Sequence, residues 1–296
     1  MGGTHGGAFP APRRRPATAI HASLTGIGEC CGNNWQGKAT MRLAILSDIH
    51  GNLPALEAVL DDLARRDVAQ VVNLGDCASG PLWPRETLAG LIALQWPTVR
   101  GNHDRILGRD RPDTMAPSDR FAHAETESAQ RTWLTLLPPA LDLGEGVMAF
   151  HARPGDDDAY LLEDVARGRL VAARPDAVAD RLGGVAGQVI LTGHSHLPAL
   201  VSLDDGRTII NPGSVGLPAY DDPAEPAHVS EAGSPLARYA VAVVEEGRLL
   251  SLDMIALPYD HEAAAARAEA NGRPEWAHAL RTGRMPPQSP ALAAVA

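Results

Sequence analysis

The sequence predicts an α/β fold, a four-layer α-β-β-α sandwich in which two mixed sheets face each other and helices flank them. Apolar strand-like runs alternate with amphipathic helices over the middle of the chain, which is typical of a parallel sheet with right-handed crossovers. Short strands separated by turns then follow, and a second sheet packed on the first is the economical use for them. A hydrophobic content of 45% and a charged content of 21% indicate a globular chain.

The first strand and helix lie within MRLAILSDIHGNLPALEAVL, residues 41–60. An apolar run stops at Ser47, and Asp48 and His50 follow before a Gly-Asn turn. Pro54 then opens an amphipathic helix. Because open α/β sheets bind ligands at the carboxyl ends of their strands, we expect Asp48 and His50 to face a ligand.

The rest of the first half repeats this alternation. We predict the further strands Ala69–Leu74, Thr98–Arg100, Val147–Phe150 and Gln188–Leu191. We predict the helices Pro84–Leu94, Phe121–Leu137 and a segment with helical pattern, broken near Gly168 and Pro175, over Ala159–Leu182. A loop rich in proline and aspartate is predicted at Arg109–Ser118.

The second half predicts the short strands Ala199–Leu203, Thr208–Ile210, Tyr239–Val244 and Leu249–Ile255. We expect one domain over residues 41–258 and a helical C-terminal tail over residues 259–296, with a frayed end from Pro286. Residues 1–40 are rich in glycine, proline and alanine without hydrophobic periodicity. We interpret them as a disordered leader or as the result of a mis-assigned start codon.

Composition restricts the partners. The net charge of −10 argues against a protein that binds nucleic acid by bulk electrostatics, and no apolar run approaches the roughly 20 residues of a membrane helix. Three cysteines, none at metal-finger spacing, suggest a reducing compartment, so we expect a cytoplasmic protein without a disulfide framework. The edge of the second sheet and the alanine-rich tail are surfaces on which a homo-oligomer would form.

Polar side chains gather at the predicted strand ends, and all of them are oxygen or imidazole donors. They are Asp48, His50, Asp76, Asn102, His151, His194 and His196. Such donors suit divalent ions such as Mn²⁺, Fe²⁺, Ni²⁺ or Zn²⁺, with Mn²⁺ our first choice. Seven ligands are too many for one ion but fit two ions with Asp76 as the bridge. Two ions about 3.5 to 4 Å apart clamp the attacking and leaving oxygens of a displacement at phosphorus.

The order of these motifs resembles the calcineurin-like metallophosphoesterase superfamily, in its branch of small bacterial phosphodiesterases and phosphatases. The similar segments are Asp48-x-His50, Gly75-Asp76, Gly101-Asn-His-Asp104, His151, Gly193-His-Ser-His196 and Asn211-Pro-Gly-Ser-Val-Gly216. A single block would be weak, whereas five metal-site blocks in this order are specific. The fold of that family, two facing sheets flanked by helices, agrees with the pattern of the elements.

The resemblance implies a role for each residue. Asp48, His50 and His196 would hold one ion, and Asn102, His151 and His194 the other, with Asp76 shared. His103 would be the general acid that protonates the leaving oxygen. Asp104 would orient the imidazole of His103 or adjust its charge. A metal-bound hydroxide would attack a phosphodiester or a phosphomonoester of a small molecule in line.

Several alternatives remain open from the sequence. The acidic net charge disfavours a nuclease of the same fold. The presence of all the predicted metal ligands disfavours a catalytically silent scaffold that only binds a partner. Asn102 and Asp104 also suit tight turns. Arg105 and Arg153 sit beside predicted ligands and are our candidates for binding substrate phosphate. The acidic loop Asp156–Asp158 is interpreted mainly as solvated, with substrate gating or an additional metal site as the alternative.

Overall fold

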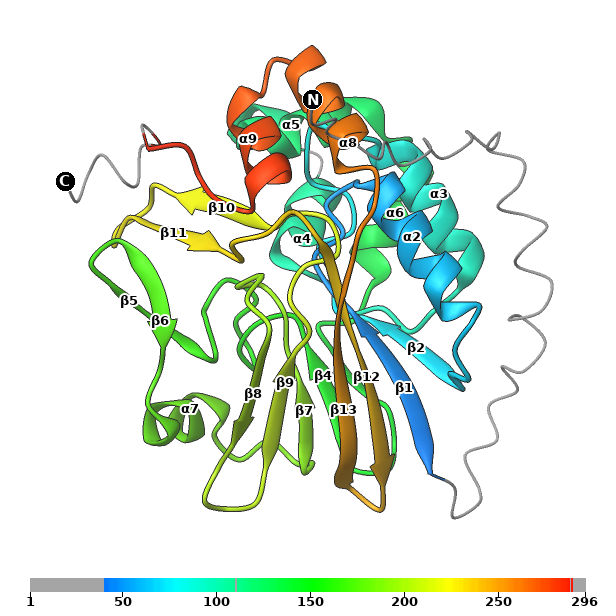
Figure 1. Cartoon of the computed structure of the whole chain (residues 1–296), viewed down its shortest axis with the longest axis vertical. Coiled ribbons are helices and arrows are strands. Elements are labelled where there is room, and N and C mark those ends of the chain that lie inside the picture. Colours follow the sequence, from blue (N-terminus) through cyan, green and yellow to red (C-terminus); the bar gives the residue numbers. More distant parts are fainter. Residues whose placement is uncertain (1–39, 110, 288, 290–296) are drawn as a thin grey trace, which may run out of the picture. The chain divides into compact units, whose positions relative to one another are not determined.

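The structure is a computed structural model that describes residues 40–109, 111–287 and 289, and these belong to one compact unit spanning residues 35–296. The predictions for residues 1–40 and for the end of the chain beyond residue 289 therefore lie outside the described residues. The first sheet contains, in spatial order, β13 (Arg248–Leu257), β12 (Ala237–Glu245), β1 (Met41–Leu46) and β2 (Gln70–Asn73). β1 is parallel to β2 and antiparallel to β12, so this sheet is mixed (Figure 1).

The second sheet is also mixed. In spatial order it contains β3 (Ala140–Asp142), β4 (Val147–Phe150), β7 (Val189–Leu191), β9 (Thr208–Asn211) and β8 (Ala199–Ser202). The three central strands are parallel, and an antiparallel strand closes each edge.

The two sheets pack face to face through alternate residues of their strands. On β1, Leu43 and Ile45 point into the space between the sheets, where they join Val147 and Ile210 of the second sheet. The intervening residue Ala44 belongs instead to the cluster beneath the helices. This period of two is the side-chain geometry of a strand that is buried on both faces.

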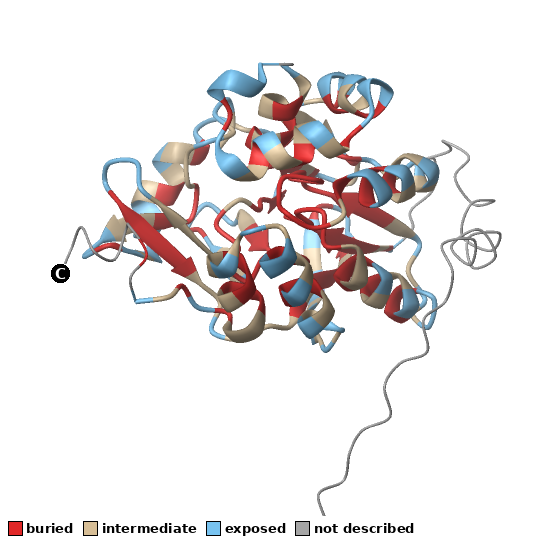
Figure 2. Ribbon diagram, turned by 90° about the horizontal axis from the view of Figure 1, so that it is seen from above, coloured by how far each residue is buried: buried red, intermediate tan, exposed pale blue. Residues whose placement is uncertain are grey.

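Helices cover the outer face of each sheet. Above the first sheet lie α2 (Leu53–Leu63), α3 (Pro84–Leu94), α4 (Asn102–Gly108), α5 (Pro117–Glu125) and α6 (Ser128–Leu136), with the short 3₁₀ segment η4 (Pro112–Thr114) between α4 and α5. Below the second sheet, α7 (Pro175–Leu182) contributes Val178 and Leu182 to a core with Ile190 and Ile209. The four-layer prediction is confirmed, and Figure 2 shows buried residues on the strands and the inward faces of the helices.

A third, smaller sheet was not predicted. Its strands in spatial order are β10 (Ala219–Asp222), β11 (His228–Glu231), β6 (Arg169–Ala172) and β5 (Glu163–Ala166). The helical reading of Ala159–Leu182 is thus wrong over its first part, which forms the β5–β6 hairpin. Arg167 and Gly168, both with positive φ, make the two-residue turn.

Two further helical regions differ from or extend the prediction. The single helix predicted over Phe121–Leu137 is two helices, because Thr126 is extended and the backbone N–H of Glu127 donates to the Gln130 side chain at 3.0 Å, which starts α6. The alanine-rich tail forms α8 (His261–Ala270) and α9 (Pro274–Thr282). These two helices pack around Leu82, with Trp276 buried at their junction. In the described part of the chain, no helix has the length and apolar character needed to cross a membrane.

Candidate metal centre

Six of the seven predicted ligands lie on loops that leave the carboxyl ends of β1, β2, β4 and β7, at one end of the two sheets. The seventh, Asn102, is the first residue of α4. The strand predicted before it, Thr98–Arg100, forms only an isolated bridge between Thr98 and Asn73. The loops after β1 and β2 are bonded together: the Asp48 N–H donates to Gly75 O and the His50 N–H to Asp76 O, each at 3.0 Å. Their backbones are left-handed, with φ of 57° at Asp48, 51° at His50 and 55° at Asp76. These left-handed residues turn the backbone sharply, so the side chains of Asp48, His50 and Asp76 point toward one place.

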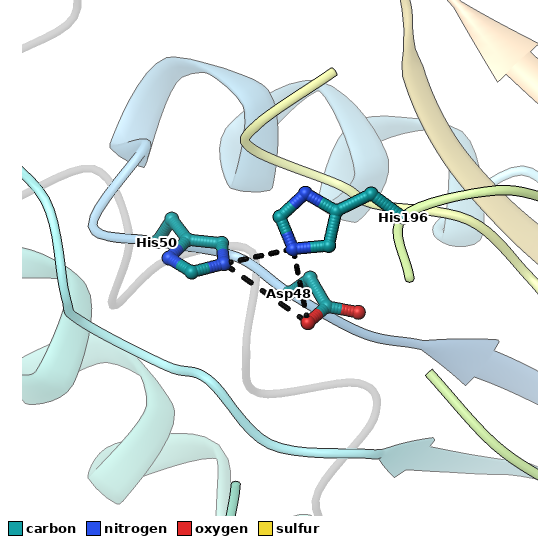
Figure 3. Close-up of side chains that lie close together, drawn as sticks. All are labelled: Asp48, His50 and His196. Atoms are coloured by element: carbon teal, nitrogen blue, oxygen red, sulfur yellow. Dashed lines mark hydrogen bonds and ion pairs between the residues drawn. The ribbon is translucent and has the colours of Figure 1, made fainter. Parts of the chain in front are cut away.

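The first cluster consists of Asp48, His50 and His196, all buried (Figure 3). Nε2 of His50 lies 3.1 Å from Nε2 of His196. Oδ1 of Asp48 lies 3.3 Å from Nε2 of His196 and 4.0 Å from Nε2 of His50. Three potential ligand atoms from β1 and the loop after β7 therefore converge.

The hydrogen bonds of the two histidines determine which nitrogen is bare. Nδ1 of His50 donates to Ser79 O at 2.8 Å, and Nδ1 of His196 donates to Leu217 O at 2.7 Å. A carbonyl can only accept, so in the neutral rings both Nε2 atoms carry lone pairs. Burial lowers the pKa of His50 to about 4, which keeps that ring neutral. Two facing lone pairs repel unless a cation lies between them.

The second cluster contains Asp76, His151 and His194, and Asn102 adjoins it. Nδ1 of His151 donates to Leu74 O at 2.8 Å, which directs its Nε2 toward Oδ2 of Asp76 at 3.3 Å and Oδ1 of Asn102 at 3.1 Å. In His194 the two ring nitrogens exchange roles. Nε2 lies 3.1 Å from the carbonyl oxygen of Asp158 and donates to it, so Nδ1 is the nitrogen that is available as a ligand. A backbone carbonyl on the second nitrogen is the usual support of a metal-binding histidine.

Asp76 lies between the clusters. Its Oδ2 is 3.3 Å from Nε2 of His151 in the second cluster and 3.9 Å from Nε2 of His50 in the first. Burial alone would raise the pKa of Asp76, but the neighbouring His151 and His103 hold it well below its usual value. This is the position that a bridging carboxylate needs.

The site has the donors and the charge that divalent ions require. Oδ1 of Asp48 is buried and accepts no hydrogen bond from the described residues. Burial would raise the pKa of Asp48, but the nearby imidazoles lower it to about 2, so this carboxylate is charged. Burial would lower the pKa of His151, yet the charges of Asp76 and Asp48 raise it to about 10. The excess negative charge thus favours either an added proton or a metal cation, and the facing lone pairs of His50 and His196 favour the cation.

His103, the predicted general acid, lies beside the first cluster, with its ring centre 5.6 Å from that of His50. Its Nδ1 is 2.7 Å from Oδ1 of Asp119 on α5, a carboxylate that is 1% exposed. Asp104 is placed differently: its carboxylate accepts backbone N–H groups of Asp76, Cys77 and Gly101 at 2.9 to 3.0 Å and fixes the loops. Sequence reasoning missed Asp119, which lies one residue beyond the predicted loop and within no recognised motif.

The two arginines predicted to bind phosphate are paired with the acidic loop. Nε and Nη2 of Arg105 form a bidentate ion pair with Asp157, and Nη2 also reaches Asp158 at 3.2 Å. Arg153 lies 3.6 Å from Asp156. The acidic loop is therefore not simply solvated, because Arg105 ties it to α4.

Two tyrosines from the region of the third sheet line the site, and the sequence offered no signal for them. The Tyr160 ring lies 4.9 Å from that of His194, and the Tyr220 ring lies 4.7 Å from that of His196. Nδ1 of His228 donates to Pro226 O, so its Nε2 accepts from the Tyr160 hydroxyl at 2.7 Å. The Tyr220 hydroxyl in turn donates to Tyr160 at 2.7 Å. One tyrosine ring thus packs against a candidate ligand in each cluster.

Comparison with known proteins agrees with this geometry. Residues 41–232 match the calcineurin-like phosphoesterase superfamily domain. An uncharacterized protein of Methanocaldococcus jannaschii is 28% identical over 258 residues, which cover 79% of this chain and 94% of that protein. A metallophosphoesterase structure from Sphaerobacter thermophilus has 25% identity and a TM-score of 0.64, covering 83% of this chain and all of that one. A hypothetical protein of Pyrococcus horikoshii shares the fold at 19% identity, a TM-score of 0.62 and the same coverage of both chains.

Proposed function

Because the chain belongs to the calcineurin-like phosphoesterase superfamily, we propose that it is a hydrolase that uses two divalent ions to cleave phosphoesters of small molecules. The observation that carries the proposal is the pair of clusters, buried except for the half-buried His194, in which imidazole nitrogens converge on a carboxylate and Asp76 lies within reach of both. Asp48, His50 and His196 would hold one ion. Asn102, His151 and His194 would hold the other, with Asp76 shared.

Two bound ions would supply an activated water and would neutralise charge on the phosphoryl oxygens. The chain supplies the proton. Since Asp119 holds Nδ1 of His103, Nε2 is the nitrogen that remains to protonate the leaving oxygen. Burial would lower the pKa of His103, but the charges of Asp119 and Asp76 raise it to about 10. As the phosphorus–oxygen bond to the leaving group breaks, the proton passes to that oxygen and solvent restores it to His103.

Mn²⁺ is the metal we propose first, because nitrogen and oxygen donors without sulfur accept it along with Fe²⁺, Ni²⁺ and Zn²⁺. We propose phosphodiesters or phosphomonoesters as the substrates, with Arg105 on α4 and Arg153 after β4 as the side chains that would bind phosphate oxygens. To do so, Arg105 would have to exchange part of its ion pair with Asp157 for the substrate.

The test is the hydrolysis of bis-p-nitrophenyl phosphate and p-nitrophenyl phosphate by chelator-stripped protein, before and after addition of Mn²⁺. We expect turnover only with the metal, and loss of most of it in Asp76→Asn. Asp253→Asn, an exposed aspartate on β13, is the matched control and should retain full activity. Full turnover by Asp76→Asn would contradict the two-metal proposal, and no turnover by metal-loaded wild type would contradict the hydrolase proposal.

A further inference from the structure

His194 is oriented differently from the other candidate histidine ligands. Each of these four histidines donates one ring nitrogen to a backbone carbonyl. In three of them the carbonyl belongs to a buried residue, namely Ser79, Leu74 or Leu217. The carbonyl that accepts from Nε2 of His194 belongs instead to Asp158, which is exposed. The core therefore fixes three of the four rings, whereas the orientation of His194 depends on a surface loop.

The other neighbours of His194 do not determine which of its nitrogens faces the second cluster. His194 is the half-buried one among the seven candidate ligands. The rings of Tyr160 and His151 flank its imidazole, with ring centres 4.9 and 5.2 Å away. These contacts restrict the plane of the ring, but a turn of 180° about the bond to Cβ keeps that plane and exchanges Nδ1 with a carbon. The hydrogen bond to Asp158 is what distinguishes the two orientations.

The loop that carries Asp158 is tied to α4 by an ion pair. Within the loop, the N–H of Asp158 donates to Oδ1 of Asp156 at 3.1 Å, which shapes the tip but does not place it against the metal centre. Asp157 makes the contact that does so. Its Oδ2 lies 2.8 Å from Nε of Arg105, and its Oδ1 lies 2.7 Å from Nη2. Two parallel charge-assisted hydrogen bonds define both the distance and the direction of the loop.

This ion pair is partly shielded and joins two parts of one candidate metal site. The side chains of Arg105 and Asp157 are each 21% exposed, so solvent and salt screen the pair less than they screen a pair on the open surface. Arg105 follows Asn102 by three residues on α4. Asn102 and His194 are both candidate ligands of the second ion. The pair therefore holds the loop that orients one ligand against the helix that carries the other.

We propose that Asp157 is a positioning residue for the second metal ion. Its ion pair with Arg105 holds the Asp158 carbonyl in place, and this carbonyl turns Nδ1 of His194 toward the ion. The inference rests on the proposed function, in which this ion is one of two, and it gives the acidic loop a role in metal binding. Asp157 acts through the loop and touches neither the metal nor the substrate.

The test measures Mn²⁺ binding without turnover, by isothermal titration calorimetry of the chelator-stripped full chain. We expect two Mn²⁺ sites in wild type. Asp157→Ala should weaken one of them by about 10- to 100-fold, which is the usual loss when the outer partner of a metal ligand is removed, and leave the other unchanged. Asp157→Glu restores a carboxylate and should recover most of that loss. Asp176→Ala is the matched control, because it removes a bidentate ion pair with Arg174 at α7 and should leave both sites as in wild type.

Turnover of bis-p-nitrophenyl phosphate gives a second measurement. Asp157→Ala should need about tenfold more Mn²⁺ or higher for half-maximal activity, and its kcat at saturating Mn²⁺ should be close to that of wild type. Equal weakening of both sites would indicate a general structural effect and overturn the positioning role. Unchanged Mn²⁺ binding with a lower KM would assign Arg105 to the substrate alone and would overturn it as well.

The proposed function fails in a different way. Wild type that binds two Mn²⁺ ions but cleaves no phosphoester would contradict the hydrolase proposal, while selective weakening of one site in Asp157→Ala would still support the positioning role. Fewer than two Mn²⁺ sites in wild type would overturn both.

Discussion

Asp119 bonds to His103 across 16 positions of sequence, with Oδ1 2.7 Å from Nδ1. His103 belongs to the first turn of α4, whereas Asp119 belongs to the first turn of α5. The carboxylate therefore holds the ring in one tautomer and one orientation while remaining buried itself. Asp119 is a positioning residue, since it acts through the imidazole and not on the substrate.

The first prediction concerns this bond. Asp119→Asn keeps the shape of the side chain but removes its charge, so we expect kcat for diesters with alkyl leaving groups to fall by about 10²-fold. For p-nitrophenyl diesters, whose leaving group needs little protonation, the fall should be small. The measurement is kcat for both substrate types. An equal loss for both would indicate a structural effect, and the positioning role would then be rejected.

The second prediction concerns a glycine that makes room for the bridging carboxylate. A Cβ added to Gly101 would lie 2.1 Å from Oδ1 of Asp76, although the φ of this residue is an ordinary −81°. Gly101→Ala should therefore displace Asp76 and reduce metal-dependent turnover by at least about tenfold, the cost expected when reacting groups are misplaced. Gly90→Ala in α3 is the control, because its added Cβ meets nothing within 4 Å and alanine stabilises a helix. Normal turnover in Gly101→Ala would show that the loop adapts.

The third prediction concerns metal binding without turnover. Mn²⁺ at a concentration 100 times its Kd stabilises a protein by about 2.7 kcal/mol, which raises the Tm of a domain of this size by about 5 to 10 °C. We expect this rise in wild type and a much smaller one in Asp48→Asn, measured by differential scanning fluorimetry. An undiminished rise in the variant would mean that Mn²⁺ binds elsewhere.

The fourth prediction concerns Glu163, which accepts the Ser195 hydroxyl at 2.7 Å beneath the loop that carries His194 and His196. Burial raises the pKa of Glu163 to about 7, against the opposing effects of Ser195 and Arg181. Because the folded protein then binds a proton more tightly than the unfolded chain does, stability falls as pH rises from about 4.5 to about 7.

Glu163→Gln resembles the protonated form of Glu163 and should therefore remove the loss of stability between about pH 4.5 and about pH 7. The gain in unfolding free energy over wild type should be on the order of 2 kcal/mol larger at pH 8 than at pH 5. Urea unfolding at the two pH values measures it. Glu86→Gln, at an exposed position of α3, is the control. A gain in Glu163→Gln that does not depend on pH would contradict the assignment.

The sequence predicted the elements whose pattern is local. The bounds of α3 and β4 were predicted to the residue, because Pro84 opens the helix and the apolar run at Val147–Phe150 ends at a histidine. The β5–β6 hairpin was missed because its Leu170 and its alanines suit a helix equally well. Its strands are defined by tertiary pairing, including the contact of Arg169 with Val229 of β11.

The residues of the candidate site were likewise predictable only where the signal is local. The predicted ligands follow strands whose ends meet by topology, so local pattern brings them to one place. Asp119, on α5, and Tyr160, in the loop before β5, instead reach the site because distant segments of the chain pack together. No periodicity or spacing in the sequence reports such contacts.

The left-handed backbone of the candidate ligands has a consequence for how the chain can evolve. Five of these residues have φ between 51° and 67°, namely Asp48, His50, Asp76, His194 and His196. Each costs stability on the order of 1 kcal/mol relative to a glycine, which adopts this conformation without strain. Replacement of any one of them with glycine would therefore relieve backbone strain and remove a candidate ligand in the same step, so at these positions stability and metal binding favour different residues.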